Sequence, residues 1–366
     1  MPEGNITLLG CGDVGPTEEP MDTYSTLARP ILATGDIRFG QCERVYSDRG
    51  SLQIHSESGP HSRVKPHMAS VFSDCDFNVV SLASNHSMDW GEDALADTIA
   101  LFQKKGIQTV GAGRNIQEAR QPAIIEHNGV RVAILGYSSV SPAGYEAGPS
   151  KVGITPLRAH TYYEAVEPQP GLPPRVVTMP YEEDLKGMVE DIAKAKKVAH
   201  VVVVSIHWGI HFIPRVIADY QPIAAKAAFE AGADLILGHH AHIPKAVAVY
   251  SGKVCFYSLS NFIMSTARRS YLNTVAKPFG LAVDPDNPRI AFKDTNRSLI
   301  AKTILSREGV KKVSFLPVLI DKQCRPEVLR RGDPRFDDAV NYMDWVSEEF
   351  HHKFVVEGDE AVVTGA

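Results

Sequence analysis

Short apolar runs and amphipathic segments alternate along residues 5 to 264. Runs rich in β-branched residues, each followed by a polar loop, are ITLLG (6–10), FNVVSLA (77–83), IQTVGAG (107–113), VRVAILGYS (130–138), HVVVVSIHWG (200–209), ADLILGHH (233–240) and KVCFYSLSNF (253–262). These runs predict strands. Between them, residues 91–106 place Leu95, Ile99 and Phe102 at helical spacing and end at Gly106, and residues 181–200 and 220–234 repeat this pattern. The alternation predicts an α/β fold whose strand ends carry the functional loops.

Two regions depart from this alternation. Residues 139–180 are rich in Pro and Gly and predict either a linker or a long ordered loop over a site; Tyr145, Tyr162 and Tyr163 favour the ordered loop. Residues 298–320 predict two strands around a Glu-Gly turn, and residues 335–354 predict an amphipathic helix. We expect residues 266–366 to pack on the core formed by residues 5–265, so that residues 1–366 form a single catalytic domain.

The composition excludes several classes of protein. The chain has 366 residues, is 44% hydrophobic and carries a formal charge of −5, which predicts a globular protein without a broad basic surface for nucleic acid. The apolar runs are too short to cross a bilayer and the N-terminus lacks a signal-peptide pattern, so we expect a cytoplasmic protein with no membrane anchor. Five scattered cysteines without a C-x-x-C pair predict neither a disulfide framework nor a thiolate zinc site. Oligomeric state is not predicted.

The first strand runs into a glycine loop that matches a dinucleotide-binding fingerprint, with glycines at positions 10, 12 and 15. That fingerprint needs a helix to begin at the glycines, but PTEEPMD follows and has no apolar periodicity. Asp13 would also place a carboxylate where two phosphates should bind. We therefore interpret Asp13 as a metal ligand, unless it stands alone as a solvated turn residue.

Asp13 does not stand alone, because polar clusters follow three further strands. They contain Asn85, His86 and Asp89; His207 and His211; and His239, His240 and His242. A single histidine after a strand is more often a hydrogen-bonded structural residue. Four strand-end clusters of carboxylate, amide and imidazole groups indicate a hydrolytic centre containing Mn, Zn or Fe.

Several of these blocks, in order over about residues 5–265, resemble one family: GDV (12–14), LASNHSMDWG (82–91), GAGRNIQEARQPAI (111–124), HWG (207–209), AGADLILGHHAH (231–242) and FYSLSNF (256–262). They are similar to the CapA/PgsA family, named for capsule poly-γ-glutamate synthesis, within the calcineurin-like metallophosphoesterase superfamily. The resemblance implies a metallo-dependent phosphatase-like fold, a four-layer α/β/β/α sandwich with a two-metal centre at its strand ends.

The resemblance also implies residue roles. It assigns the metal ligands Asp13, Glu43, Asn85, His207, His240 and His242. His86 is implied to contact the transferred group, with Asp89 orienting its imidazole or else capping the following helix. The chain departs from the family at Gly15, where a histidine is usual, and at Gln41-Cys42-Glu43, where Asn-Leu-Glu is common.

Several further residues are candidates to bind substrate. We expect His211 and His239 beside the ligands, and Asn261 either near the substrate or in a simple turn. Basic residues that could hold an anionic substrate, or could be ordinary solvated surface, are Arg63, Lys65, Arg114, Arg268 and Arg269. The loop with His55, His61 and His67 is a further candidate to face substrate.

These observations favour a metal-dependent hydrolase that attacks a phosphoester or an amide in a small-molecule or peptide-like substrate through a metal-activated water. Two divalent transition metals are expected. Two alternatives stay open: a repurposed site that performs acid-base chemistry as a lyase or epimerase, or a non-catalytic protein that binds or assembles poly-γ-glutamate.

Overall fold

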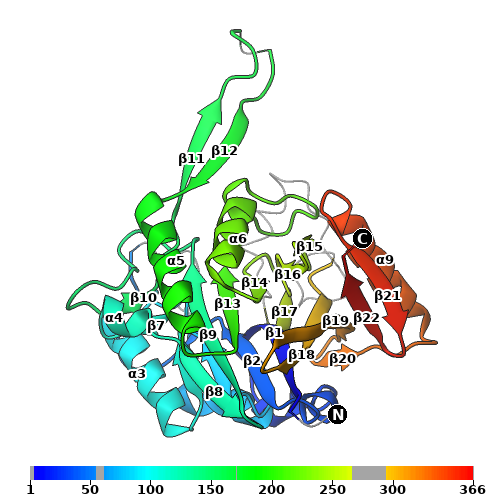
Figure 1. Ribbon diagram of the computed structural model, residues 1–366. Coiled ribbons are helices and arrows are strands. Elements are labelled where there is room, and N and C mark those ends of the chain that lie inside the picture. The colour runs from blue at the N-terminus through cyan, green and yellow to red at the C-terminus, as the bar shows by residue number, and fades with distance from the viewer. Residues whose placement is uncertain (1–3, 55–61, 170, 266–293, 366) are drawn as a thin grey trace.

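Two β-sheets pack face to face in the computed structural model, which describes residues 4–54, 62–169, 171–265 and 294–365 (Figure 1). The larger sheet has the strand order β21-β22-β19-β18-β1-β2-β5-β6. Its strands are β1 (Ile6–Gly15), β2 (Ile37–Cys42), β5 (Val79–Ser81), β6 (Gln108–Val110), β18 (Arg297–Ser306), β19 (Gly309–Ile320), β21 (Lys353–Glu357) and β22 (Glu360–Thr364). Two short strands extend it, because β17 (Asn261–Met264) pairs with β1 and β20 (Pro326–Val328) pairs with β19.

The second sheet has the strand order β15-β16-β14-β13-β9-β8. Its strands are β8 (Ala123–His127), β9 (Val130–Ser138), β13 (Val201–His207), β14 (Leu235–His239), β15 (Val247–Tyr250) and β16 (Lys253–Phe256). Strands β9, β13, β14 and β16 are parallel, as are β1, β2, β5 and β6 in the first sheet. The carboxyl ends of these parallel strands carry the polar clusters noted in the sequence.

The longer helices are α3 (Gly91–Lys104), α5 (Glu182–Lys196), α6 (Tyr220–Ala231) and α9 (Pro334–Ser347), and shorter ones are α1 (Arg29–Leu32), α2 (Ser70–Asp74) and α4 (Ile116–Ala119). α3 covers the outer face of the first sheet and α5 and α6 cover that of the second, whereas α9 packs against β15, β19 and β21. The predicted helices over 91–106, 181–200 and 220–234 are confirmed by α3, α5 and α6. The helix predicted over residues 335–354 is confirmed by α9, but α9 ends at Ser347 and residues 353–364 form the hairpin β21–β22.

The side chains of each central strand divide between two apolar layers. In β1, Leu8 points into the layer between the sheets and Leu9 into the layer under α3; in β13, Val203 points between the sheets and Val204 toward α5 and α6. All ten residues of β1 and all seven of β13 are buried, as expected for strands covered on both faces. The α/β/β/α order of layers expected from the resemblance is therefore confirmed.

The C-terminal segment joins this architecture through the first sheet. β18 and β19 form the predicted pair of strands, and β18 pairs antiparallel with β1. Met343 and Val346 of α9 contribute to the apolar layer between the sheets. These are the contacts that one domain would make, although the number of domains stays a prediction.

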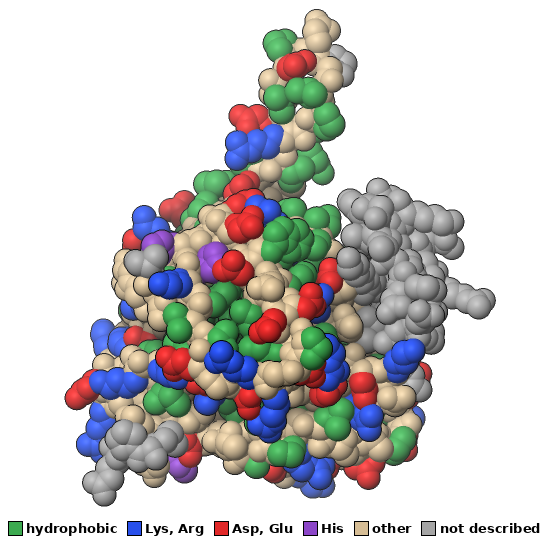
Figure 2. All heavy atoms as spheres, turned by 90° about the vertical axis from the view of Figure 1, so that its right-hand side faces the viewer, with side chains coloured by type: hydrophobic (Ala, Val, Ile, Leu, Met, Phe, Trp, Pro, Cys, Tyr) green, Lys and Arg blue, Asp and Glu red, His purple; other side chains and the backbone are tan. Residues whose placement is uncertain are grey.

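The segment 139–180 is ordered where the structure describes it, and part of it leaves the body of the protein. Strand β10 (Gly153–Ile154) pairs with β7 (Ala112–Gly113), while β11 (Ala159–Glu164) and β12 (Arg175–Pro180) form a hairpin that projects as an arm (Figures 1 and 2). Tyr162 and Tyr163 are exposed on this arm, whereas Tyr145 is buried. Tyr145 is thus the aromatic residue of the segment that reaches the interior.

Candidate metal centre

The glycine loop at the end of β1 serves close packing of the backbone. A Cβ atom at Gly12 would lie 2.0 Å from the Ser260 carbonyl oxygen, and the Asp13 N–H donates to that same oxygen at 2.9 Å. Asp13 pairs with Asn261 of β17 and Gln41 of β2 across irregular register. The loop therefore lets two backbones approach each other and leaves the Asp13 side chain buried at the strand end.

Histidines from the second sheet meet Asp13 from the other side. His207 and His239 are register partners at the ends of β13 and β14. His240 and His242 follow with φ values of 87° and 56°, a left-handed backbone that costs a non-glycine residue about 1–3 kcal/mol and is found most often at functional sites. This strained turn brings both imidazoles back toward the strand ends.

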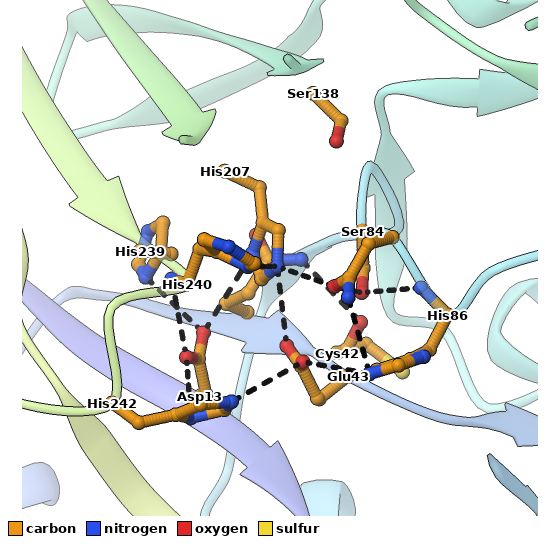
Figure 3. Close-up of polar contacts among 12 residues, drawn as sticks. Asp13, Cys42, Glu43, Ser84, His86, Ser138, His207, His239, His240 and His242 are labelled. Atoms are coloured by element: carbon orange, nitrogen blue, oxygen red, sulfur yellow. Dashed lines mark hydrogen bonds and ion pairs between the residues drawn. The ribbon is translucent and has the colours of Figure 1, made fainter. Parts of the chain in front are cut away.

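The nearest potential ligand atoms surround a small volume between the two sheets (Figure 3). One ligand atom from each of Asp13, Glu43 and His207 lies within 4.8 Å of the other two. Glu43 Oε2 is 3.6 Å from His207 Nε2, and His242 lies between the carboxylates, with Nδ1 3.6 Å from Asp13 Oδ2 and Nε2 3.9 Å from Glu43 Oε1. Carboxylate and imidazole groups at these separations suit a divalent transition metal.

Amide side chains orient the histidines. Asn85 Oδ1 lies 2.9 Å from His207 Nε2, and Asn261 Oδ1 lies 2.7 Å from His242 Nδ1. The Asn261 Nδ2 group donates to the Thr295 carbonyl at 3.1 Å, which fixes the direction of the amide. Asn261 is thus buried in the site and holds His242, and it does not form the simple exposed turn that was the alternative.

The buried polar atoms of this cluster are poorly satisfied within the described part of the chain. Asp13 Oδ1, both Glu43 carboxylate oxygens, His207 Nδ1 and both His239 ring nitrogens form no hydrogen bond there. Burial raises the pKa of Asp13 and Glu43, and for Glu43 the charge of Asp13 raises the pKa further. Burial also lowers the pKa of His207 well below its usual value, and the pKa of His242 to about 4. Unpaired carboxylates and neutral imidazoles are what a bound cation would stabilise, so these residues fit a metal.

His86 lies beside this cluster with its own hydrogen-bond partners. Its Nδ1 is 2.9 Å from Asp89 Oδ2, and the Tyr145 hydroxyl donates to Asp89 Oδ1 at 2.9 Å. The opposite nitrogen, Nε2, faces the cluster, 3.8 Å from Glu43 Oε1. Asp89 does not cap α3, whose N-cap residue is Trp90. The geometry therefore favours the first role considered for Asp89, orientation of His86.

The structure gives a physical account of the two departures from the family pattern. A Cβ at Gly15 would lie 2.6 Å from Arg44 Cγ, so the buried Arg44 side chain occupies the space beside this position. Gln41 is buried and donates to the Ala83 carbonyl at 3.1 Å, which joins the end of β2 to the loop that carries Asn85. Glu43 still reaches the cluster.

Other predicted substrate-binding residues lie differently. The rings of His211 and His240 are in contact, with centroids 3.8 Å apart and a tilt of 31°. The three basic side chains are held by neighbours outside the cluster: Arg63 lies over the Trp90 ring, Lys65 pairs with Asp48, and Arg114 pairs with Glu118. His67 pairs with Glu19, while His55, His61, Arg268 and Arg269 lie outside the described residues.

Sequence reasoning missed two residues. Tyr145 was noted only as a sign of order, and Arg44 was not noted at all. Neither residue had a usable signal in the sequence. Tyr145 comes from a loop about 60 residues after Asn85 and could be recognised only from its contact with Asp89 in the structure. Arg44 is a single arginine beside an acidic residue, and such an arginine usually lies on the protein surface.

The layered fold and the carboxylate and histidine cluster at its strand ends define a protein of the metallophosphoesterase type. The family model described as bacterial capsule synthesis protein PGA_cap matches residues 11–266, and the chain belongs to that family. It is 30% identical over 245 residues to PGA biosynthesis protein CapA of Bacillus subtilis, covering 66% of this chain and 57% of that protein. It is also 30% identical over 240 residues to the capsule biosynthesis protein CapA of Bacillus anthracis, covering 64% of this chain and 52% of that protein.

The chain thus spans about half the length of the curated relatives it matches. Among solved structures, it is similar to the calcineurin-like phosphoesterase YfkN of Bacillus subtilis, with 12% identity, 89% of each chain covered and a TM-score of 0.37. That score is too low to support an inference about chemistry. Among the helices that the structure describes, none is both long and apolar enough to cross a membrane.

Proposed function

We propose that the protein is a metal-dependent hydrolase whose ligands are Asp13, Glu43, Asn85, His207, His240 and His242. The observation that carries this proposal is the set of buried, unpaired polar atoms on Asp13, Glu43 and His207. Leaving such groups unpaired costs about 1–3 kcal/mol each, which a bound cation would offset. Divalent transition metals bound there would supply a more acidic water and positive charge beside the oxygen of the attacked phosphoryl or carbonyl group.

The chain's own residues then have distinct tasks. His86 donates its Nδ1–H to Asp89, which fixes the ring with Nε2 directed toward the cluster; when Nε2 is protonated as well, it can donate that proton to the oxygen or nitrogen that leaves. Asn85 and Asn261 hold His207 and His242 in fixed rotamers. Asp13, Glu43, His207 and His239 are completely buried, whereas side-chain surface of His86 and His242 is exposed, so substrate approaches from the side of these two histidines.

The substrate we propose is a phosphoester or an amide of peptide-like character. The names of the relatives, which refer to PGA and capsule biosynthesis, support an anionic peptide-like chain. A relative from Mycobacterium tuberculosis, 27% identical over 192 residues, is named a probable polyglutamine synthesis accessory protein. That name supports the second candidate function, a role in assembling a peptide-like polymer without hydrolysis. The acid-base alternative predicts activity that survives removal of metal.

The test combines elemental analysis of protein purified without chelator with hydrolysis assays on phosphoesters and γ-glutamyl amides. We expect bound transition metal in the wild type, little in Asp13→Ala and His240→Ala, and hydrolysis that is lost with the metal. Asp97→Asn is the matched control, because Asp97 lies on α3 and binds Ser47 and Arg49, away from the cluster. A folded wild type without metal would rule out the mechanism; bound metal without hydrolysis of either class would favour the assembly role.

A further inference from the structure

His239 is completely buried and is the least satisfied histidine of the cluster within the described part of the chain. It ends β14, has no exposed surface, and packs against Phe39 with ring centroids 5.7 Å apart. Neither of its ring nitrogens forms a hydrogen bond with any residue that the structure describes. A neutral imidazole carries both a donor and an acceptor, so an apolar side chain would fit this position at lower cost.

The polar atoms nearest His239 are unpaired as well. His239 Nδ1 lies 3.7 Å from Asp13 Oδ1, which is too long for a hydrogen bond. His207 Nδ1 lies 4.0 Å from the same oxygen. Within the described chain, none of these three atoms has a hydrogen-bond partner. Two unpaired ring nitrogens, from β13 and β14, therefore flank one buried carboxylate oxygen of β1.

The hydrogen bond on the far side of His207 indicates which of its nitrogens is available. Asn85 Oδ1 lies 2.9 Å from Nε2, and an amide oxygen accepts hydrogen bonds, so the ring proton belongs on Nε2. The lone pair is then on Nδ1, directed toward Asp13, which is the arrangement of a metal-bound histidine whose second nitrogen donates to a fixed acceptor.

We propose that Asp13 Oδ1 and His239 Nδ1 bind the same cation, so that His239 is a metal ligand in addition to the residues assigned above. Two ligands each about 2.1 Å from one ion lie roughly 3–4 Å apart, which matches the separation of His239 Nδ1 from Asp13 Oδ1. The inference rests on the proposed function, because it assigns a further ligand to the same centre. It replaces the expectation that His239 contacts substrate, since complete burial leaves substrate no access to it.

Cobalt binding by the 366-residue chain tests this assignment without an activity assay. Chelator-treated wild type, His239→Phe, His239→Asn and His352→Phe are titrated with Co²⁺, with heat of binding and visible absorption recorded. His352→Phe is the matched control, since the His352 side chain is 9% exposed and binds Asp344 and the Phe350 carbonyl, away from the cluster. We expect His239→Phe to lose one Co²⁺ per chain or to bind it at least tenfold more weakly, His239→Asn to bind with intermediate affinity, and His352→Phe to keep the wild-type stoichiometry.

The possible failures are distinguishable. Phenylalanine fills the pocket against Phe39, so a merely structural His239 predicts Co²⁺ binding and absorption equal to wild type in His239→Phe, and that result overturns the inference while leaving the proposed function intact. If His239→Phe does not fold, His239→Asn with wild-type affinity and spectrum overturns it equally. A wild type that binds no Co²⁺ overturns the proposed function and this inference together.

Discussion

The two halves of the candidate site differ in how their buried polar atoms are satisfied. Around Asp13 Oδ1, the ring nitrogens His207 Nδ1 and His239 Nδ1 lie 4.0 and 3.7 Å away, and none of these three atoms forms a hydrogen bond within the described part of the chain. Around His86, by contrast, both Asp89 oxygens are used, one by His86 and the other by Tyr145. The first half is incomplete without a ligand, whereas the second is already organised. The contrast indicates where a metal would bind and where a proton would be transferred.

The most severe way to break the first half is to neutralise its central carboxylate. Asp13→Asn should lower hydrolytic activity by about a thousandfold, because metal charge stabilisation is worth several kcal/mol. The same substitution should stabilise the metal-free protein against urea, since it removes a buried unpaired charge. Activity assays and urea unfolding in chelator measure the two effects; an active Asp13→Asn enzyme would contradict the metal assignment.

Breaking the second half should affect catalysis and spare metal binding. His86→Gln should lower the rate by about a hundredfold on substrates with poor leaving groups, the usual worth of a proton-transfer residue. Activated aryl esters, whose leaving groups need no proton, should be much less affected. Elemental analysis should find the wild-type metal content. Equal losses on both kinds of substrate would show that His86 does not protonate the leaving group.

The pH dependence of the free energy of unfolding should also distinguish the contributions of His239 and Asp13, both in the first half of the site. Burial lowers the pKa of His239 to about 3, so between that value and about 6.5 the unfolded chain binds a proton that the folded chain does not. Stability that is present above about pH 6.5 is therefore lost as the pH falls, by up to about 1.4 kcal/mol per pH unit for this group. Metal-free His239→Phe should show a correspondingly flatter loss, measured by urea unfolding at several pH values.

Asp13 provides the opposite sign in the same experiment. Its pKa is raised in the folded protein, so its contribution is greatest below its unfolded pKa and is lost as the pH rises through the folded pKa. Metal-free Asp13→Asn should therefore lose less stability than wild type as the pH rises. Parallel curves for wild type and both variants would mean that neither pKa is perturbed by folding.

The smallest expected effect is that of substituting Tyr145, which contacts Asp89 in the second half of the site. Tyr145→Phe removes one hydrogen bond to Asp89, worth about 1 kcal/mol, so the rate should fall roughly fivefold with unchanged metal content. Tyr162→Phe on the projecting arm is the control, because Tyr162 is exposed. A rate that falls equally in both variants would show that Tyr145 does not act through the orientation of His86.

Much of the fold was readable in the sequence because its signals are local. The helical spacing of Leu95, Ile99 and Phe102 predicted α3, and the apolar runs before Asp13, His207 and His239 predicted buried strands. The hairpin β21–β22 was missed because its residues continue a segment that is partly helical in pattern. The order of the layers came only from the resemblance, and the order of the strands was not predicted, since pairing depends on contacts between residues far apart in the chain.

The sequence by itself determined which side chains are available for the site and that they follow strands. Only the tertiary structure decided which of them meet. Arg63, Lys65 and Arg114 were also candidates for the site, but each is held by a neighbour outside the cluster. His239 lies beside Asp13, although the two are 226 positions apart, because β1 and β14 end at the same edge of the stacked sheets. Chemical type is a local property of the chain, whereas burial and the absence of a hydrogen-bond partner arise from packing, so the unpaired atoms that indicate the metal centre could be found only in the folded protein.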